Sequence, residues 1–386
     1  MGYKPRQQGL RMGKYFTAIL FYPIFGLIGL IVASFGVRNS NIATTVSDTS
    51  ILYMLFSFAV ACWVIYLLSR AVGTAEPEDR SPSQVSPIHL YMIFAALVVV
   101  TCLPLIVYGA PIFTGLNRYE FANLEFVSDL RQLDNAISWV FVISLAVRIS
   151  PRNRTILWSI LMVLAFCYGD KFSPLARIAF FELIIRLYWR ESIREKSAIF
   201  LGFLLGVFML GGVVIYWWTG ALSDVFDGFI QRAGKQASCT IAVSEMLGFM
   251  SDRTSIFWNF FEAQSEGKSF FHEVSRAISL RSDQSVLGDS FPCVYMAMSP
   301  DVFTLAGMLV VSTAIKVLLL KFAFVFLDKV NLGLVSVFVF FLYIRYLDSM
   351  IASDKFHLLI HPVFLFSAYF MLLMIIAKWH RQLTYD

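Results

Sequence analysis

Residues 88–110 read IHLYMIFAALVVVTCLPLIVYGA and contain no Asp, Glu, Lys or Arg. As an α-helix this stretch would be about 35 Å long at 1.5 Å per residue, which is enough to cross the hydrocarbon core of a bilayer. A helix that is apolar all round has no polar face to turn toward water. The stretch therefore predicts a transmembrane helix.

Similar apolar runs recur along the whole chain of 386 residues, of which 58% are apolar and 15% charged. Soluble domains carry roughly 25% charged residues. With a mean hydropathy of +0.70, we expect an all-α polytopic membrane protein, with residues 1–386 as one transmembrane domain of about ten helices. The predicted spans cover residues 15–37, 50–69, 88–110, 134–149, 155–169, 173–189, 197–218, 302–327, 332–346 and 355–377.

Two of these spans leave alternatives open. Residues 155–169 and 173–189 are short and are separated by a polar, proline-containing break, so they form either two short helices or one re-entrant hairpin. The first span, residues 15–37, is long and lacks a small-residue cleavage site, which favours a permanent helix over a signal peptide.

The basic residues predict the orientation. If the N-terminus is cytoplasmic, most basic residues of the short connections lie on the cytoplasmic side, as the positive-inside rule requires. That side holds Lys4, Arg6, Arg11, Lys14, Arg70, Arg80, Arg148, Arg152, Arg154, Arg190, Arg194, Lys196, Lys329, Lys378 and Arg381, and the opposite side holds Arg38, Arg118, Arg131, Lys171 and Lys355. We therefore expect both termini on the inside.

One connection is much longer than the others. Residues 219–301 separate the seventh and eighth predicted helices and would lie on the outer face. Loops of this length in compact domains are usually functional. Mixed apolar and polar patterns at residues 241–250, 255–263 and 270–280 predict short amphipathic helices within it.

The outer loops and helix ends carry a set of basic side chains suited to an anionic ligand. Arginine binds phosphate through a planar fork and lysine acts as a point charge. The set comprises Arg118, Lys171, Arg177, Arg232, Lys235, Arg253, Lys268, Arg276 and Arg281. Local pairing is the better reading for Arg253 beside Asp252 and for Lys268 beside Glu266.

Charged residues at membrane depth are costly and face a cavity or a partner. Arg345 is one of them, and Asp348 follows it by one turn, so the two either neutralise each other or serve a site. Glu182 and Arg186 have i,i+4 spacing in mid-helix, which favours a structural pair.

Glu120, beside Arg118 in the first outer loop, and His272, in the long loop, are candidate general bases. His357 and His361 have i,i+4 spacing at the start of the last predicted helix, but no HExxH pattern or third ligand accompanies them, and the cysteines form no CxxC pair. We expect no metal site.

The sequence lacks the GxxxxGK[ST] phosphate loop, the GxGxxG motif and the GxSxG motif, which disfavours an ATP-driven pump, a nucleotide-dependent redox enzyme and a typical serine hydrolase. Chemistry on the outer face would therefore need a substrate that already carries the energy, and a lipid-linked diphosphate sugar meets that condition.

Four segments resemble the bacterial O-antigen and oligosaccharide repeat-unit polymerases, the Wzy-like family. They are GLNRYEF at residues 115–121, YGDKFSPL at 168–175, FIQRAGKQ at 229–236 and GDSFP at 288–292. The architecture is similar along most of the chain, whereas the motifs are short. One departure is Ala237-Ser238-Cys239, where the polymerase loops often carry an aromatic residue.

The resemblance implies a GT-C-like glycosyltransferase that uses a lipid-phosphosugar donor, without a nucleotide sugar, cofactor or obligatory metal. The growing glycan on polyprenyl diphosphate would be the donor, and a fresh lipid-linked repeat unit the acceptor. The implied catalytic residues are Arg232 for the diphosphate, with Glu120 or His272 as the base. The implied substrate-binding residues are Arg118, Tyr119, Lys171, Arg177, Gln236, Arg276, Arg281 and Arg345.

The resemblance also implies a multi-pass protein of the bacterial inner membrane, with the long loop in the periplasm. Its partners would be lipid-linked oligosaccharide, membrane lipids and a chain-length regulator protein, and no nucleic acid. Three alternatives stay open: a ligase that uses the same lipid carrier, a flippase or ion-coupled transporter, and a purely structural membrane protein. The long outer loop and the missing internal repeat argue against a transporter.

Overall fold

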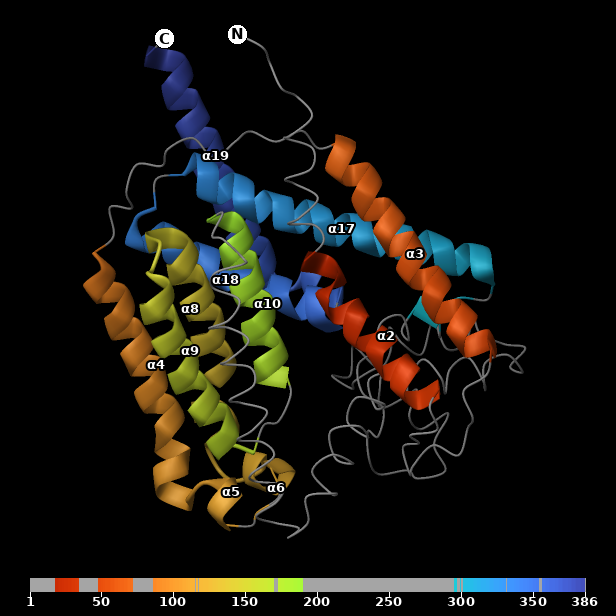
Figure 1. Ribbon diagram of the computed structural model, residues 1–386. Helices are drawn as coiled ribbons and strands as arrows, with labels where there is room; N and C mark the ends of the chain where they lie inside the picture. Colours follow the sequence, from red (N-terminus) through yellow and green to blue (C-terminus); the bar gives the residue numbers. More distant parts are fainter. Residues whose placement is uncertain are drawn as a thin grey trace. The chain divides into compact units, whose positions relative to one another are not determined.

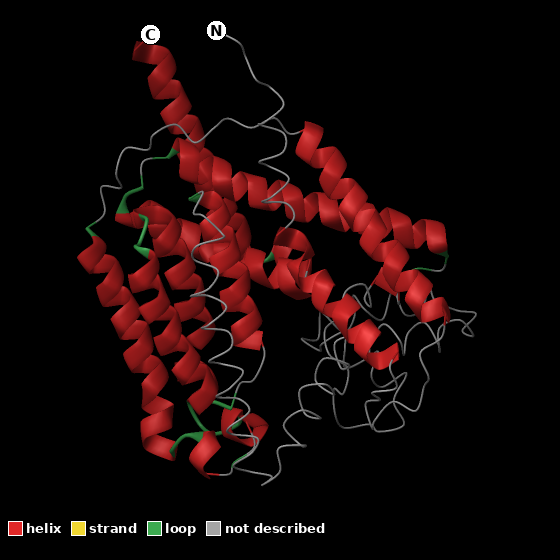
Figure 2. Ribbon diagram, in the orientation of Figure 1, coloured by secondary structure: helices red, strands yellow, loops and turns green. Residues whose placement is uncertain are grey.

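The computed structural model describes residues 18–34, 48–71, 86–114, 116, 118–169, 173–189, 295–296, 299, 301–330, 332–353 and 356–385. Regular structure in these ranges is helical throughout (Figure 2). The helices are η1 (Ala18–Leu20), α2 (Phe21–Ser34), α3 (Asp48–Ala71), α4 (Pro87–Tyr108), α5 (Pro111–Thr114), α6 (Arg118–Ala122), α7 (Val127–Leu130), α8 (Leu133–Val147), α9 (Pro151–Cys167), α10 (Ser173–Tyr188), α17 (Val302–Lys329), α18 (Leu334–Ser353), η2 (Phe356–Ile360) and α19 (Pro362–Tyr385).

Within these ranges, six helical segments are long and apolar enough to cross a membrane. They are Ser50–Ser69, Pro87–Thr114, Val127–Val147, Val302–Lys329, Leu334–Ala352 and Pro362–His380. They coincide with six of the predicted spans, so the prediction of a helical, multi-pass membrane protein is confirmed.

The other predicted spans have different outcomes. Residues 155–169 and 173–189 form two separate α-helices, α9 and α10, both shorter than the six. Of the first predicted span, η1 and α2 cover Ala18–Ser34, and residues 15–17 and 35–37 lie outside the described residues. The span at residues 197–218 and the long loop up to residue 294, with its three predicted amphipathic helices, lie outside the described residues.

The side of α19 shows why the chain needs a bilayer. Leu365, Tyr369, Leu372 and Ile376 are exposed and recur at i, i+4, i+7 and i+11, which places them in one stripe along the helix. An exposed apolar stripe of this length is a liability in water and a suitable surface for lipid.

The chain divides into two compact units that alternate along the sequence. The first contains η1, α2, α3, α17 up to Leu319 and residues 349–357. Its helices α2 and α3 pack through Leu30 and Met54. The second unit contains α4–α10, α17 from Leu320, α18 up to Asp348, and α19.

Helix α8 is the core of the second unit. It is buried along nearly its whole length, because α4, α9 and α10 run beside it (Figure 1). The indole N–H of Trp139 donates to the Leu90 carbonyl of α4 at 3.0 Å, and its ring meets Phe341 of α18 edge to face. Phe141 stacks on Phe181 of α10 with ring centroids 4.2 Å apart. These aromatic contacts fix α8 against three other helices.

The later helices join the same unit through aromatic pairs. Phe326 of α17 stacks on Phe340 of α18, and Tyr343 of α18 stacks on Phe364 of α19 at 5.1 Å. Tyr188, at the end of α10, stacks on Phe324 of α17 at 5.3 Å. Phenylalanine-rich helices thus bring together segments that are far apart in the sequence.

Candidate functional site

Three short helices, α5, α6 and α7, connect α4 to α8 and carry the first candidate motif. Figure 1 shows α5 and α6 gathered at one end of the bundle of α4, α8, α9 and α10. Phe121 of α6 and Val127 of α7 are buried with Tyr168, the residue that follows α9. The Phe121 and Tyr168 rings meet edge to face at 5.7 Å. Phe121 and Tyr168, which belong to two of the segments that resemble the polymerase family, are therefore in direct contact.

Tyr168 fixes the point where α9 ends. Its hydroxyl donates to the Thr101 carbonyl of α4 at 2.7 Å, and the guanidinium of Arg131 lies 5.2 Å from its ring centroid. Gly169 follows with φ of +71°, a left-handed conformation that glycine adopts without steric penalty. The chain thus turns out of α9 at a fixed place, at Gly169.

We expect Tyr168→Phe to keep the ring contacts but remove the hydrogen bond to Thr101. A net intramolecular hydrogen bond is worth about 0.5–1.5 kcal/mol. The thermal unfolding temperature of the purified protein should fall by a few degrees. Tyr369→Phe, at an exposed position of α19, is the matched control and should unfold at the wild-type temperature. Equal unfolding temperatures for Tyr168→Phe and the wild type would contradict the role of this hydroxyl.

Glu120, a predicted base, lies on α6 next to the buried Phe121, and its own side chain is exposed. The backbone of Arg118 and Tyr119 lies on the same short helix. Because Phe121 is anchored on Tyr168, α6 has a defined position at the end of the bundle. A carboxylate on this helix is accessible from solvent while its backbone is held.

Arg177, a predicted substrate-binding residue, lies one turn into α10 and is held by two carboxylates. Its Nη1 lies 2.6 Å from Oδ1 of Asp134, in the first turn of α8, and its Nε lies 2.5 Å from Oδ2 of Asp348 on α18. We call these three side chains the Arg177 cluster. It ties three helices of the second unit together near the end where α6 lies.

Arg345 does not form the ion pair with Asp348 that its spacing suggested. The possible i,i+3 pairing of Arg345 with Asp348 is not what the structure has, because Asp348 is buried and paired with Arg177. Arg345 is exposed, and its guanidinium lies 5.9 Å from the ring centroid of Tyr346. Although the two residues are one turn apart on α18, Asp348 is buried and Arg345 is exposed.

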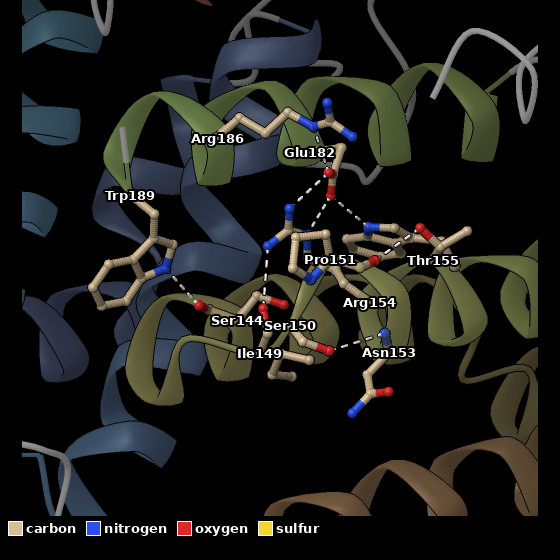
Figure 3. A network of polar contacts seen from close by, with 11 residues as sticks. Ser144, Ile149, Ser150, Pro151, Asn153, Arg154, Thr155, Glu182, Arg186 and Trp189 are labelled. Carbon is tan, nitrogen blue, oxygen red and sulfur yellow. Dashed lines mark hydrogen bonds and ion pairs between the residues drawn. The ribbon is translucent and has the colours of Figure 1, made fainter. Parts of the chain in front are cut away.

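A second charged cluster lies deeper in the same unit (Figure 3). Glu182 of α10 accepts two hydrogen bonds from Arg154 of α9, from Nε at 2.7 Å and from Nη2 at 2.9 Å. It also accepts from Arg186 at 2.7 Å and from the indole of Trp158 at 3.0 Å. All three charged residues are buried.

The predicted structural pair of Glu182 and Arg186 is confirmed, and Arg154 is its missed third member. The predicted spans place Arg154 in a short connection, whereas in the structure it begins the buried face of α9. The spacing held a signal, because Arg154 and Trp158 are four residues apart and so share one helix face. The buried bidentate pair of Arg154 and Glu182 joins α9 to α10 and is not accessible to a ligand.

Contrary to the sequence prediction, His357 and His361 do not lie together at the start of the last helix. His357 lies in the 3-10 helix η2, and His361 precedes α19, so they do not share the start of one α-helix. The Nδ1 atom of His361 accepts from the backbone N–H of Val363, and its ring lies 4.6 Å from that of Tyr346. Within the described ranges, no group of three His, Cys, Asp or Glu side chains is arranged to hold a metal ion.

Six predicted site residues lie outside the described residues: Lys171, Arg232, Gln236, His272, Arg276 and Arg281. Of the remaining five, Arg118, Tyr119 and Glu120 share α6, and Arg177 and Arg345 lie on α10 and α18. Comparison of the chain with family models, curated proteins and solved structures gave no match.

Proposed function

We propose that the protein is an O-antigen polymerase, a glycosyltransferase of the bacterial inner membrane. The observation that carries the proposal is the contact of Phe121 with Tyr168 at 5.7 Å, which joins α6 to the break after α9. These two segments are among the four that resemble the polymerase family. In the proposal, this end of the bundle faces the periplasm and receives the lipid-linked substrates.

The proposed topology has about ten spans, with both termini in the cytoplasm. Helices α9 and α10 are included because they pack on the buried α8, which is itself long enough to cross with α7. The ionised side chains of Arg154, Glu182 and Arg186 are paired with one another, and Arg177 is paired with α8 and α18, as charges at membrane depth require. The loop at residues 219–301 then lies on the periplasmic side.

The proposed reaction moves the growing glycan from polyprenyl diphosphate to a hydroxyl at the non-reducing end of a lipid-linked repeat unit. The bond between the anomeric carbon and the diphosphate oxygen breaks, and a bond from that carbon to the acceptor oxygen forms. Glu120 or His272 takes the acceptor proton. The diphosphate leaves with the bonding electrons, and Arg232, Lys171, Arg118 and Arg281 stabilise its charge.

Two further features support this assignment of roles. Glu120 is exposed on an anchored helix, which suits a base that must meet a large acceptor. Both substrates are confined to the membrane, so their encounter is close to intramolecular once the lipids are bound, and much of the acceleration comes from positioning. Tyr119, Gln236, Arg276 and Arg345 complete the proposed substrate contacts.

Deleting the gene and running the surface polysaccharide on a gel tests the proposal. We expect the ladder of long glycans to collapse to a single repeat unit, and Arg232→Ala to give the same pattern. Loss of every glycan-bearing band would instead indicate a ligase or flippase. Arg232→Lys should also lose the ladder, because lysine cannot bind a diphosphate through two parallel hydrogen bonds. Full polymer length and yield with Arg232→Lys would exclude this role.

A further inference from the structure

The two carboxylates that hold Arg177 differ sharply in exposure. The side chain of Asp348 is 2% exposed, that of Asp134 is 66% exposed, and that of Arg177 is 17% exposed. The arginine thus lies between a buried partner and an accessible one. Each partner binds a different nitrogen, Nε for Asp348 and Nη1 for Asp134.

Asp348 is the partner that cannot leave. It lies within the membrane span Leu334–Ala352, and its Oδ1 has no hydrogen-bond partner, so its charge depends on Arg177. Separating a buried ion pair leaves an uncompensated charge in a medium of low polarity. Asp348 therefore holds the guanidinium in one orientation.

Asp134 is the partner that can leave. An exposed ion pair contributes little net free energy, because water and counterions compensate both charges when it opens. Asp134 also lies in the first turn of α8, where the helix N-terminus stabilises a negative charge after the arginine has gone. Opening this pair therefore costs little on either side.

We propose that Arg177 is a diphosphate-binding residue whose Nη1 is occupied by Asp134 until the ligand arrives. The diphosphate takes Nη1 from Asp134, while Asp348 keeps Nε and so acts as the positioning residue. The ligand offers more negative charge than one carboxylate, so it displaces Asp134 where a weak monovalent anion does not. Binding of a diphosphate at Arg177 does not depend on the proposed function; only the assignment of that diphosphate to a lipid carrier rests on it.

The test measures binding of inorganic pyrophosphate to the full-length protein in detergent, by isothermal titration at fixed ionic strength. Asp134→Asn and Asp348→Asn both remove one negative charge next to Arg177, yet we expect opposite results. Asp134→Asn should tighten binding by about 2- to 5-fold, since the competing pair is gone. Asp348→Asn should weaken it at least about tenfold, since the guanidinium is no longer oriented.

Asp129→Asn is the matched control, because Asp129 is an exposed aspartate on neighbouring α7 and the charge change is the same. It should shift the dissociation constant less than twofold. If all three variants bind pyrophosphate more tightly by the same factor, the cause is the change in net charge, and the inference is wrong. Weaker binding in Asp134→Asn would overturn it too. If Asp348→Asn does not fold, the comparison of Asp134→Asn with Asp129→Asn decides alone.

Farnesyl diphosphate in the same titration distinguishes the source of the ligand. Tighter binding of farnesyl diphosphate than of pyrophosphate would indicate a lipid-linked diphosphate. Equal affinity would contradict the lipid-linked ligand and indicate a site for free diphosphate. If the polysaccharide ladder stays intact after gene deletion but Asp134→Asn binds pyrophosphate more tightly, the polymerase function is wrong and the diphosphate site at Arg177 stands. If the ladder is lost but Asp134→Asn does not bind more tightly, the site is wrong and the polymerase function stands.

Discussion

Replacing Glu182 with Gln is expected to lower the free energy of unfolding by about 3–5 kcal/mol, the usual cost of breaking a buried ion pair by removing one partner. Arg154 is 0% exposed and Arg186 is 6% exposed, so neither charge can turn to water in place. Glu182 accepts hydrogen bonds from both arginines and from Trp158. A neutral amide cannot compensate two guanidinium charges.

Unfolding of the purified protein in mixed micelles, followed by tryptophan fluorescence, measures this loss. Glu125→Gln, at an exposed position, is the matched control. A triple variant, Glu182→Leu with Arg154→Met and Arg186→Met, should recover most of the loss, because apolar residues of similar volume replace buried ions at little cost. If Glu182→Gln unfolds like the wild type, the buried network does not stabilise the contact between α9 and α10.

Replacing Phe121 with Ala is expected to cost about 3–5 kcal/mol and to detach α6 from the bundle. Phe121 is 1% exposed and meets both Tyr108, at 6.4 Å, and Tyr168, at 5.7 Å. Its removal leaves a cavity between α4 and the end of α9. Because Glu120 is the preceding residue, the proposed base loses its fixed position, and polymer yield should fall at least about tenfold.

Phe121→Leu separates the two effects, because it retains much of the volume. It should recover most of the stability and most of the polymer. Phe113→Ala on α5 is the control, since Phe113 is 82% exposed. Glu120→Gln should keep wild-type stability while losing polymer if Glu120 is the base. A stable Phe121→Ala variant with a full-length ladder would show that α6 does not depend on this anchor.

The sequence predicted the helical membrane fold because that fold depends on local composition. Six predicted spans match helices of the structure to within a few residues at most ends, since a run of apolar residues forms a helix in lipid whatever its neighbours are. The pair of Glu182 and Arg186 was predictable for the same reason, because four residues along a helix are always adjacent.

The candidate site was predictable only in part. Segments 115–121 and 168–175 could be chosen from their residues, but their contact through Phe121 and Tyr168 could not be derived, because nothing local links α6 to α9. The partner of Asp348 shows the limit more clearly. Local spacing offered Arg345, and the structure pairs Asp348 with Arg177 of another helix.

The sequence by itself thus determined the composition of the helices and their suitability for a bilayer, which follow from short-range periodicity and from the transfer of apolar side chains into lipid. Only the tertiary structure decided which charges meet. Arg154 joins Glu182, and Arg177 joins the buried Asp348 and the exposed Asp134, because helix packing brings these groups together and a buried charge needs an opposite charge nearby in space. Distance along the chain does not enter that requirement.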